Sequence, residues 1–236
     1  MACKEGKLCA AAREGKVGVV KRLLKEGVSV NSSNGFAQTI LMLAAMEGHD
    51  ELVRLLLDKG ADVLAIDKWG KTVLFTSVLR GHTRVVELLL TKVVDVNATD
   101  NYGQTVLMIA AQMGQAEIVR LLMENRADAS VKDNDNQTAL TLAVEEQHHE
   151  VVKLLVADWV DLNDVDHRGK TVLILAVENN DEDVIKTLVT NGARDDTLLK
   201  NGRTAFMHAA SMGYTQILKH LVKCTHVNHK DNDGYS

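Results

Sequence analysis

The chain has 236 residues, of which 46% are hydrophobic and 25% charged, so it is expected to fold around a substantial buried core. Its formal net charge of −5 argues against nucleic acid as a partner, because nucleic-acid-binding proteins usually present a basic face. No apolar run approaches the roughly 18 residues of a membrane span, and the charged N-terminus lacks the apolar stretch of a secretory signal.

The sequence repeats itself every 33 residues, which is typical of a solenoid. A threonine followed by a small or β-branched residue and then a large apolar one recurs at this spacing, at Thr39, Thr72, Thr105, Thr138, Thr171 and Thr204. Small residues follow on the same face, as in Ala44-Ala45, and then a leucine-rich stripe, as in residues 52–57. Each repeat therefore predicts two short helices, the first with a small face and the second rich in leucine.

In chain order, the predicted repeats within one domain, 1–236, are residues 1–33, 34–66, 67–99, 100–132, 133–165, 166–198 and 199–230. The first repeat has more basic than acidic residues and is expected to be an N-terminal cap. Residues 231–236 match the first strand of an eighth repeat, as in a piece of a longer protein or a chain with a bare end. The pattern predicts an all-α solenoid of helix-turn-helix units joined by β-hairpin loops.

The segments between helices carry turn and cap signals. Asp-x-x-Gly sequences such as 67–70 fit type I turns, and the following threonine is expected to cap the first helix. A glycine such as Gly60 would end the second helix, but three consecutive repeats carry Val93, Arg126 and Trp159 there, which predicts less favourable turns. Asn136 replaces a turn glycine and is expected to tolerate a positive φ.

The repeats resemble ankyrin repeats along essentially the whole chain. Residues 72–75 (Thr-Val-Leu-Phe), Gly81-His82, residues 85–90 and residues 95–98 match that pattern closely. The proline that usually follows the threonine is Ile, Val or Ala here, which we expect to cost some tenths of a kcal/mol per repeat. The resemblance implies a module that binds another protein, as part of a larger scaffold or adaptor protein, and not an enzyme.

The concave surface of such a solenoid is formed by loop tips and by the ends of the first helices. The partner-binding candidates at these positions are Phe36, Met46, Trp69, Leu79, Arg80, Tyr102, Met113, Asp135, Glu145 and Glu146. Three aromatic residues at one loop position in successive repeats fit a peptide-binding hot spot. The alternative is that these rings belong to the loop pattern and bind nothing. The acidic residues favour a partner in which a basic segment follows an apolar one.

Catalytic motifs are missing from the sequence. It has no phosphate-binding glycine loop, nucleophile elbow or zinc-protease helix, so we expect neither an enzyme nor a cofactor. Three cysteines without a C-x-x-C pair indicate free thiols in a reducing compartment, and hence a cytoplasmic or nuclear protein. A cluster of His220, Cys224, His226 and His229 fits a solvated turn better than a zinc site, so no metal is predicted.

Recurring polar residues have structural interpretations. We expect His49 and His82 to form backbone hydrogen bonds in the turn between the helices of a repeat. Side-chain bonding within a turn is expected for Asn31, Asn97, Asn163 and Asn228. Asn97 also resembles the asparagines that are hydroxylated in many ankyrin proteins.

A small-ligand or nucleotide sensor is the alternative function. Residues 163–178 resemble one repeat of the oligoadenylate-dependent ribonuclease family, in which loop-tip aromatics stack on adenine. That resemblance implies that Trp69 or Tyr102 could bind a base beside Lys68, Lys71 and Arg80. The catalytic domains of that family have no counterpart in this sequence.

Overall fold

The computed structural model describes residues 2–158, 160–199, 201–222, 224 and 229–235. Two compact units make up the chain. Unit 1 comprises residues 1–110 and 117–127, and unit 2 comprises residues 111–116 and 128–236. The single domain expected from the sequence stays a prediction.

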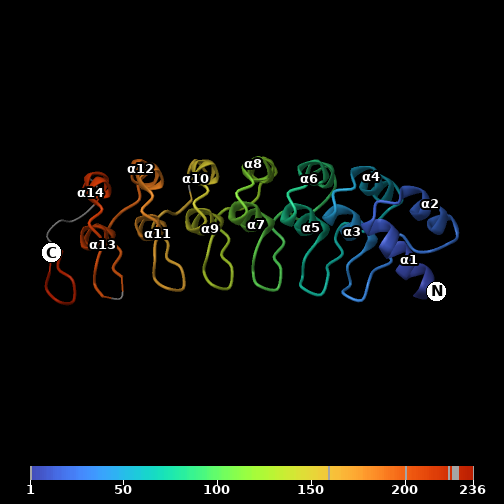
Figure 1. The fold of residues 1–236 in the computed structure, drawn as a ribbon, viewed down its shortest axis with the longest axis horizontal. Helices are drawn as coiled ribbons and strands as arrows, with labels where there is room; N and C mark the ends of the chain where they lie inside the picture. The colour runs from blue at the N-terminus through green and yellow to red at the C-terminus, as the bar shows by residue number, and fades with distance from the viewer. Residues whose placement is uncertain (1, 159, 200, 223, 225–228, 236) are drawn as a thin grey trace. The chain divides into compact units, whose positions relative to one another are not determined.

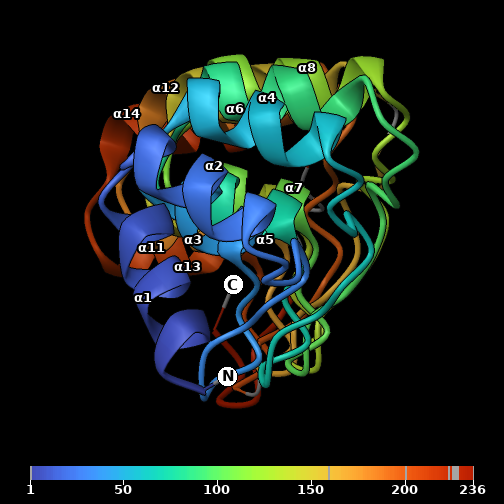
Figure 2. The same ribbon diagram turned by 90° about the vertical axis from the view of Figure 1, so that its right-hand side faces the viewer.

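Unit 1 contains consecutive helix pairs (Figure 1). They are α1 (Ala2–Arg13) with α2 (Val17–Lys25), α3 (Ile40–Met46) with α4 (Asp50–Asp58), α5 (Val73–Leu79) with α6 (Thr83–Leu90), and most of α7 (Val106–Gln112) and α8 (Ala116–Glu124). The first helix of each pair packs on the first helix of the next, α1 on α3 and α3 on α5, while α4 packs on α6. Figure 2 shows the two resulting layers of unit 1, with the loops extending from the layer of first helices.

Unit 2 has the same arrangement. Its helices are α9 (Ala139–Glu145), α10 (His149–Val156), α11 (Val172–Glu178), α12 (Glu182–Thr190), α13 (Ala205–Ser211) and α14 (Thr215–Leu221). The helices α9, α11 and α13 pack in succession, as do α10, α12 and α14. The all-α solenoid predicted from the periodicity is confirmed. None of the described helices is long and apolar enough to span a membrane.

The two helix layers are buried to different extents. In α3 every residue from Ile40 to Ala45 is buried, because small side chains such as Ala44 let neighbouring backbones approach closely. In α4 only the stripe of Leu52, Val53 and Leu56 is buried. Each fully buried leucine contributes about 1.5–3 kcal/mol. The first helices therefore form the core, and the second helices cover it with one face.

The threonine caps are confirmed with one exception. The side chains of Thr39, Thr105, Thr138, Thr171 and Thr204 accept a hydrogen bond from the backbone N–H three residues later. Thr138 forms a capping box, since Thr141 bonds back to its N–H. Thr72 has no side-chain cap hydrogen bond, although its carbonyl accepts from the N–H of Thr76.

Non-glycine residues occupy several positive-φ positions. Asn136 has φ 56°, as predicted, and Arg126 has φ 66°. Ala37, at the turn position that is Gly70 in the next repeat, has φ 61°, where its Cβ is strained. Val93 is not among the positive-φ residues and is 89% exposed; helix α6 ends earlier, with Thr91 still in the right-handed region. Trp159 lies outside the described residues.

The loops between repeats are turns with few strand-like pairings. Isolated antiparallel bridges join Ser33 to Thr39 and Thr99 to Thr105, and no described segment forms an extended strand. The expected β-hairpins are therefore short hydrogen-bonded turns. Within residues 229–235 the side chain of Asp231 accepts hydrogen bonds from the N–H groups of Asp233 and Tyr235, as in the earlier loops.

Candidate protein-binding surface

An Asp or Asn side chain, buried in each case except Asn34, organises the loop tips that begin at residues 34, 67, 100, 133 and 166. Asp67 is 5% exposed, and its Oδ1 accepts hydrogen bonds from the N–H of Trp69 and of Lys71, each at 2.9 Å. Asn34, Asp100, Asp133 and Asp166 bond the equivalent N–H groups of their own loops. Because the anchor is fixed from inside the turn, the residue two positions later points outward.

Backbone hydrogen bonds join neighbouring loop tips in unit 1. The N–H of Lys68 donates to the carbonyl of Phe36 at 3.1 Å, and the N–H of Asn101 donates to the carbonyl of Trp69 at 3.0 Å. The Asn101 side chain also donates to the carbonyl of Lys68. These bonds hold the three loops in register, so the outward-pointing residues have fixed spacing.

Two of the predicted aromatic residues are stacked. The ring centroids of Phe36 and Trp69 are 5.5 Å apart with an interplanar angle of 26°, closer than the roughly 10 Å between packed helices. Phe36 is 54% exposed and Trp69 39% exposed. The Lys68 ammonium lies 5.9 Å from the centroid of the Phe36 ring, within range of a cation–π interaction. We call Phe36, Lys68 and Trp69 the aromatic face.

The other unit 1 candidates differ in how exposed they are and in what they contact. Tyr102 is 60% exposed, and no ring contact joins it to Trp69 among the described residues. Leu79 and Arg80 are exposed at the end of α5. Met46 is half-buried. The structure therefore brings Phe36 and Trp69 into contact but does not continue the stack to Tyr102.

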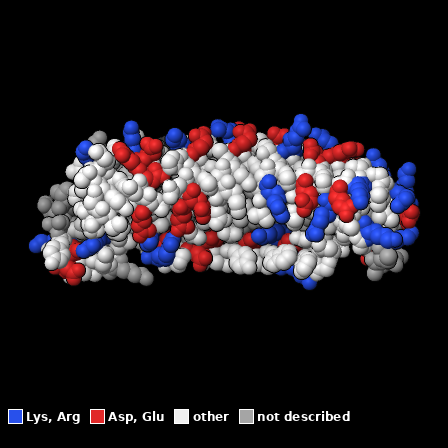
Figure 3. Space-filling view, in the orientation of Figure 1, with Lys and Arg blue, Asp and Glu red and all other residues white. Residues whose placement is uncertain are grey.

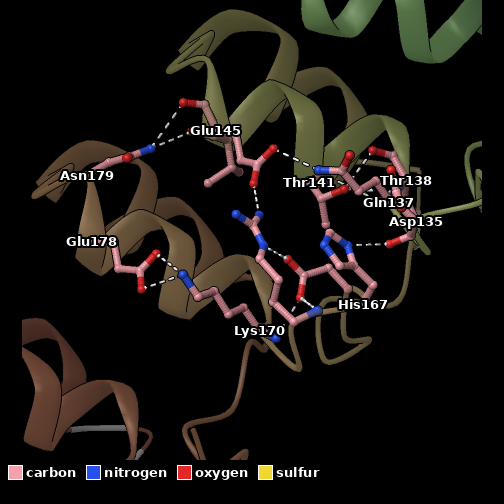
Figure 4. Close-up of polar contacts among 12 residues, drawn as sticks. Asp135, Gln137, Thr138, Thr141, Glu145, His167, Lys170, Glu178 and Asn179 are labelled. Carbon is pink, nitrogen blue, oxygen red and sulfur yellow. Dashed lines mark hydrogen bonds and ion pairs between the residues drawn. The ribbon is translucent and has the colours of Figure 1, made fainter. Parts of the chain in front are cut away.

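In unit 2 the predicted acidic residue Glu145 is already paired. Its Oε1 accepts a hydrogen bond from the Arg168 guanidinium, and its Oε2 accepts one from Gln137 Nε2 at 2.7 Å (Figure 4). Arg168 also donates through Nε to Asp166 at 2.9 Å. Figure 3 shows acidic and basic side chains close together on the presented face of unit 2. The Glu145 carboxylate is therefore already bound within the protein, and Arg168 shares its single positive charge between Glu145 and Asp166.

The remaining candidates in unit 2 are exposed. Glu146 and the side chain of Asp135 form no hydrogen bond or ion pair with a described residue, while the Asp135 carbonyl accepts from both the N–H and the ring Nδ1 of His167. Met113 is 48% exposed and belongs to unit 2. Among the three predicted carboxylates, Asp135 and Glu146 are the ones free to meet a basic partner.

The hydrogen bonds of Asp166 and Arg168 shift both pKa values. Burial would raise the pKa of Asp166, but hydrogen bonds from the Lys170 backbone and from the side chain and backbone of Arg168 outweigh it and hold the pKa below its ordinary value. Hydrogen bonds to Asp166 and then to Glu145 raise the pKa of the Arg168 guanidinium. Asp166 and Arg168 therefore both remain charged at neutral pH.

The histidines form backbone hydrogen bonds, as predicted, but between repeats. Nε2 of His82 lies 2.9 Å from the carbonyl oxygen of Met46, and His49 bonds the carbonyl of Arg13 in the same way. A Cβ added to Gly48 would lie 2.6 Å from the ring of His82, so glycine is needed for this close approach. The acceptors Met46 and Arg13 end the first helices of the preceding repeats, so each ring reaches the interhelical turn of the repeat before its own.

The recurring asparagines also connect repeats. Oδ1 of Asn31 accepts from the N–H of Asp62 at 2.9 Å, and Oδ1 of Asn163 accepts from the N–H of Arg194. Nδ2 of Asn97 donates to the carbonyl of Arg126. Bonding within one turn was the wrong expectation, since each side chain bonds the next repeat. Asn228 lies outside the described residues.

The described members of the histidine–cysteine cluster bond to other groups. His220 Nε2 lies 3.0 Å from a Glu182 carboxylate oxygen, Cys224 donates to the carbonyl of Leu221, and His229 contacts the carbonyl of Gly202. Within the described part of the chain, no group of three or more His, Cys, Asp or Glu residues is placed to hold a metal ion. His226 lies outside the described residues.

Sequence reasoning missed the pairing of Glu145 with Arg168. The sequence contained a signal for this pair. Glu145 is the last residue of the first helix in its repeat, and Arg168 is at the tip of the next loop, so the two positions are neighbours in consecutive repeats. Lys68 was recognised at a loop tip, but its position over Phe36 was not expected.

Comparison with known proteins gives a family match. A search of curated proteins finds no match. The family model for ankyrin repeats in three copies matches residues 8–100, 61–133, 92–166 and 157–233. These overlapping matches span nearly the whole chain and agree with the loop and cap geometry described above. The chain therefore belongs to the ankyrin-repeat family.

Proposed function

We propose that the protein binds a segment of a partner protein on the aromatic face of unit 1. Ankyrin repeats are generally protein–protein interaction modules, which supports a binding role over a catalytic one. The observation that carries the proposal is the exposed Phe36–Trp69 stack. Its rings are held in place by hydrogen-bonded loops before any partner arrives.

Preorganisation is the physical reason for choosing this surface. Aromatic side chains supply large contact areas, and rings that are already ordered lose little conformational freedom on binding. Lys68 adds positive charge beside the Phe36 ring, and Arg80, in the same repeat as Trp69, is exposed and has no ion-pair partner among the described residues. A partner segment with an apolar or aromatic side chain and a neighbouring carboxylate fits these groups.

A second contribution comes from unit 2. Asp135 and Glu146 are exposed carboxylates without a partner among the described residues, and they suit a basic segment. Glu145 is a weaker candidate, because a partner would have to displace Arg168. The proposed setting is a larger scaffold or adaptor protein.

Quantitative affinity purification with mass spectrometry tests the proposal. Wild-type protein is compared with Phe36→Ala and Trp69→Ala, and with Tyr235→Ala as a control that removes another exposed aromatic ring, 71% exposed, from a unit 2 loop. The proposal expects partners to be lost from the first two variants and retained by the third. Equal recovery on all four baits would overturn it, provided that circular dichroism shows each variant folded.

A nucleotide sensor predicts a different result. One face of the Trp69 ring is already covered by Phe36, so an adenine could stack only on the other. Titration of adenine nucleotides in a Trp159→Phe background, where Trp69 is the remaining tryptophan, reports on that stacking. Saturable quenching of Trp69 fluorescence would favour the nucleotide alternative over a protein partner.

A further inference from the structure

A second surface lies on the outer helices of unit 1, away from the loop tips. A groove of about 390 Å³ is lined by Lys21, Leu24 and Lys25 of α2 and by Leu55 and Lys59 of α4 and its C-terminal end. Figures 1 and 2 both show α2 beside α4 at the N-terminal end of unit 1. The backbones of α2 and α4 approach less closely than those of α4 and α6, which leaves room for the groove.

Helical spacing directs these side chains to one side. Leu24 and Lys25 follow Lys21 by three and four residues, so both lie next to Lys21 on one face of α2. Leu55 and Lys59 are four residues apart at the end of α4. The leucines are half-buried and form an apolar floor, while the three lysines are exposed around it.

The lysines of the groove lack partners within the described structure. Among the described residues, no hydrogen bond or ion pair involves the side chain of Lys21, Lys25 or Lys59, and no acidic residue is among the lining residues. Glu26, at the end of α2, is instead bonded to Lys4 at 2.7 Å. The groove therefore combines exposed apolar surface with uncompensated positive charge.

The set of three lysines distinguishes the groove between α2 and α4 from the equivalent positions of later repeats. At the position of Lys25 in later repeats, the sequence has Asp58, Thr91 and Glu124. The combination of three lysines is therefore not required by the repeat itself.

We propose that this groove binds an acidic amphipathic segment of a partner protein. An aliphatic or aromatic side chain of the segment packs on Leu24 and Leu55, and its Asp or Glu carboxylates pair with the surrounding lysines. The lysine stems extend the apolar floor while their ammonium groups stay in water. Charge complementarity selects a carboxylate-rich segment, and the apolar floor selects one with a hydrophobic side chain between the carboxylates. The groove does not depend on the aromatic face.

A displayed random-peptide library selected on the whole protein is the test. Enriched peptides are synthesised, and their binding is measured by fluorescence anisotropy at low and high salt. The proposal expects enriched sequences with a hydrophobic residue flanked by Asp or Glu, whose binding weakens with salt.

Matched variants locate the binding. Lys21→Glu and Leu55→Ala are compared with Lys153→Glu and Leu154→Ala, which change the equivalent positions of α10 in unit 2. Each groove variant is expected to weaken binding about tenfold, while the control variants and Trp69→Ala leave it unchanged.

Several results would overturn the proposal. These are a lack of acidic amphipathic sequences among the enriched peptides, equal losses in the groove and control variants, or unchanged binding to Lys21→Glu. Binding of phosphatidylserine vesicles that requires Lys21, with no such peptide bound, would assign the groove to a membrane surface instead. Loss caused by Trp69→Ala alone would point to the aromatic face.

Discussion

The ring of Phe36 lies against the ring of Trp69, with centroids 5.5 Å apart and planes inclined by 26°. The two residues are one repeat apart and occupy the same loop position. Their contact joins consecutive repeats at the surface where a partner is proposed to bind. It therefore has consequences both for stability and for recognition.

A double-mutant cycle measures the energy of this contact. Phe36→Ala, Trp69→Ala and the double variant are expected to show a coupling of about 0.5–1 kcal/mol in urea unfolding, because the stacked rings are partly exposed. A parallel cycle on Phe36 and Tyr102, which are not in ring contact, should give additive effects. Strict additivity in the first cycle would mean that the rings do not interact in solution.

Ala37→Gly is expected to stabilise the protein. Ala37 has φ 61°, a left-handed conformation in which its Cβ costs about 1 kcal/mol, and glycine removes this strain. The free energy of unfolding should rise by about that amount in chemical denaturation. The same substitution at Ala10, an exposed residue inside α1, should lower it by about 0.5–1 kcal/mol. Destabilisation by Ala37→Gly would contradict the assigned backbone conformation.

Asp166 is expected to make stability depend on acid pH. Its pKa lies below the ordinary value of 3.8 in the folded protein, because the Lys170 and Arg168 hydrogen bonds outweigh the effect of burial. Its stabilising contribution is therefore complete above pH 3.8 and is lost as the pH falls through the lower folded pKa.

Urea unfolding at several pH values compares wild type with Asp166→Asn and with Asp158→Asn, a change at an exposed carboxylate. The stability of Asp166→Asn should fall less at acid pH than that of wild type, because the carboxylate whose protonation costs stability has been removed. The stability of Asp158→Asn should fall as much as that of wild type. Identical pH profiles for wild type and Asp166→Asn would contradict the assigned role.

Cys224 is expected to react slowly with thiol reagents. Burial, followed by the nearby charge of Asp195, raises the pKa of its thiol from 9.0 to about 11, which lowers the thiolate fraction at pH 8 about a hundredfold. A Cys3→Ser/Cys9→Ser variant isolates this thiol. Labelling with a disulfide reagent should be much slower in buffer than in denaturant, whereas equal rates would show an accessible thiol with an ordinary pKa.

The sequence was sufficient for features that depend on one repeat. The period predicted the paired helices, the cap at Thr39 and the positive φ of Asn136, because local spacing and backbone preferences determine them. Contacts between repeats were harder to predict. The bond from His82 to the Met46 carbonyl and the pairing of Glu145 with Arg168 depend on side-chain directions across a repeat boundary, which the period alone does not specify.

The candidate binding surface shows the same division. Sequence position predicted that Phe36, Trp69 and Tyr102 occupy loop tips, but not that Phe36 and Trp69 stack while Tyr102 has no ring contact among the described residues. Charge counting likewise grouped Glu145 with Glu146. The structure separates them, because Arg168 pairs with Glu145, whereas Glu146 is exposed.

Isothermal titration of a recovered partner tests the role of the aromatic face most directly. The dissociation constant is measured for wild type, Trp69→Ala and the Tyr235→Ala control. We predict that Trp69→Ala weakens binding by about thirtyfold, as expected for loss of a hot-spot residue worth about 2 kcal/mol, while Tyr235→Ala binds like wild type. Unchanged affinity of a folded Trp69→Ala variant would contradict the proposal that the partner binds at the aromatic face.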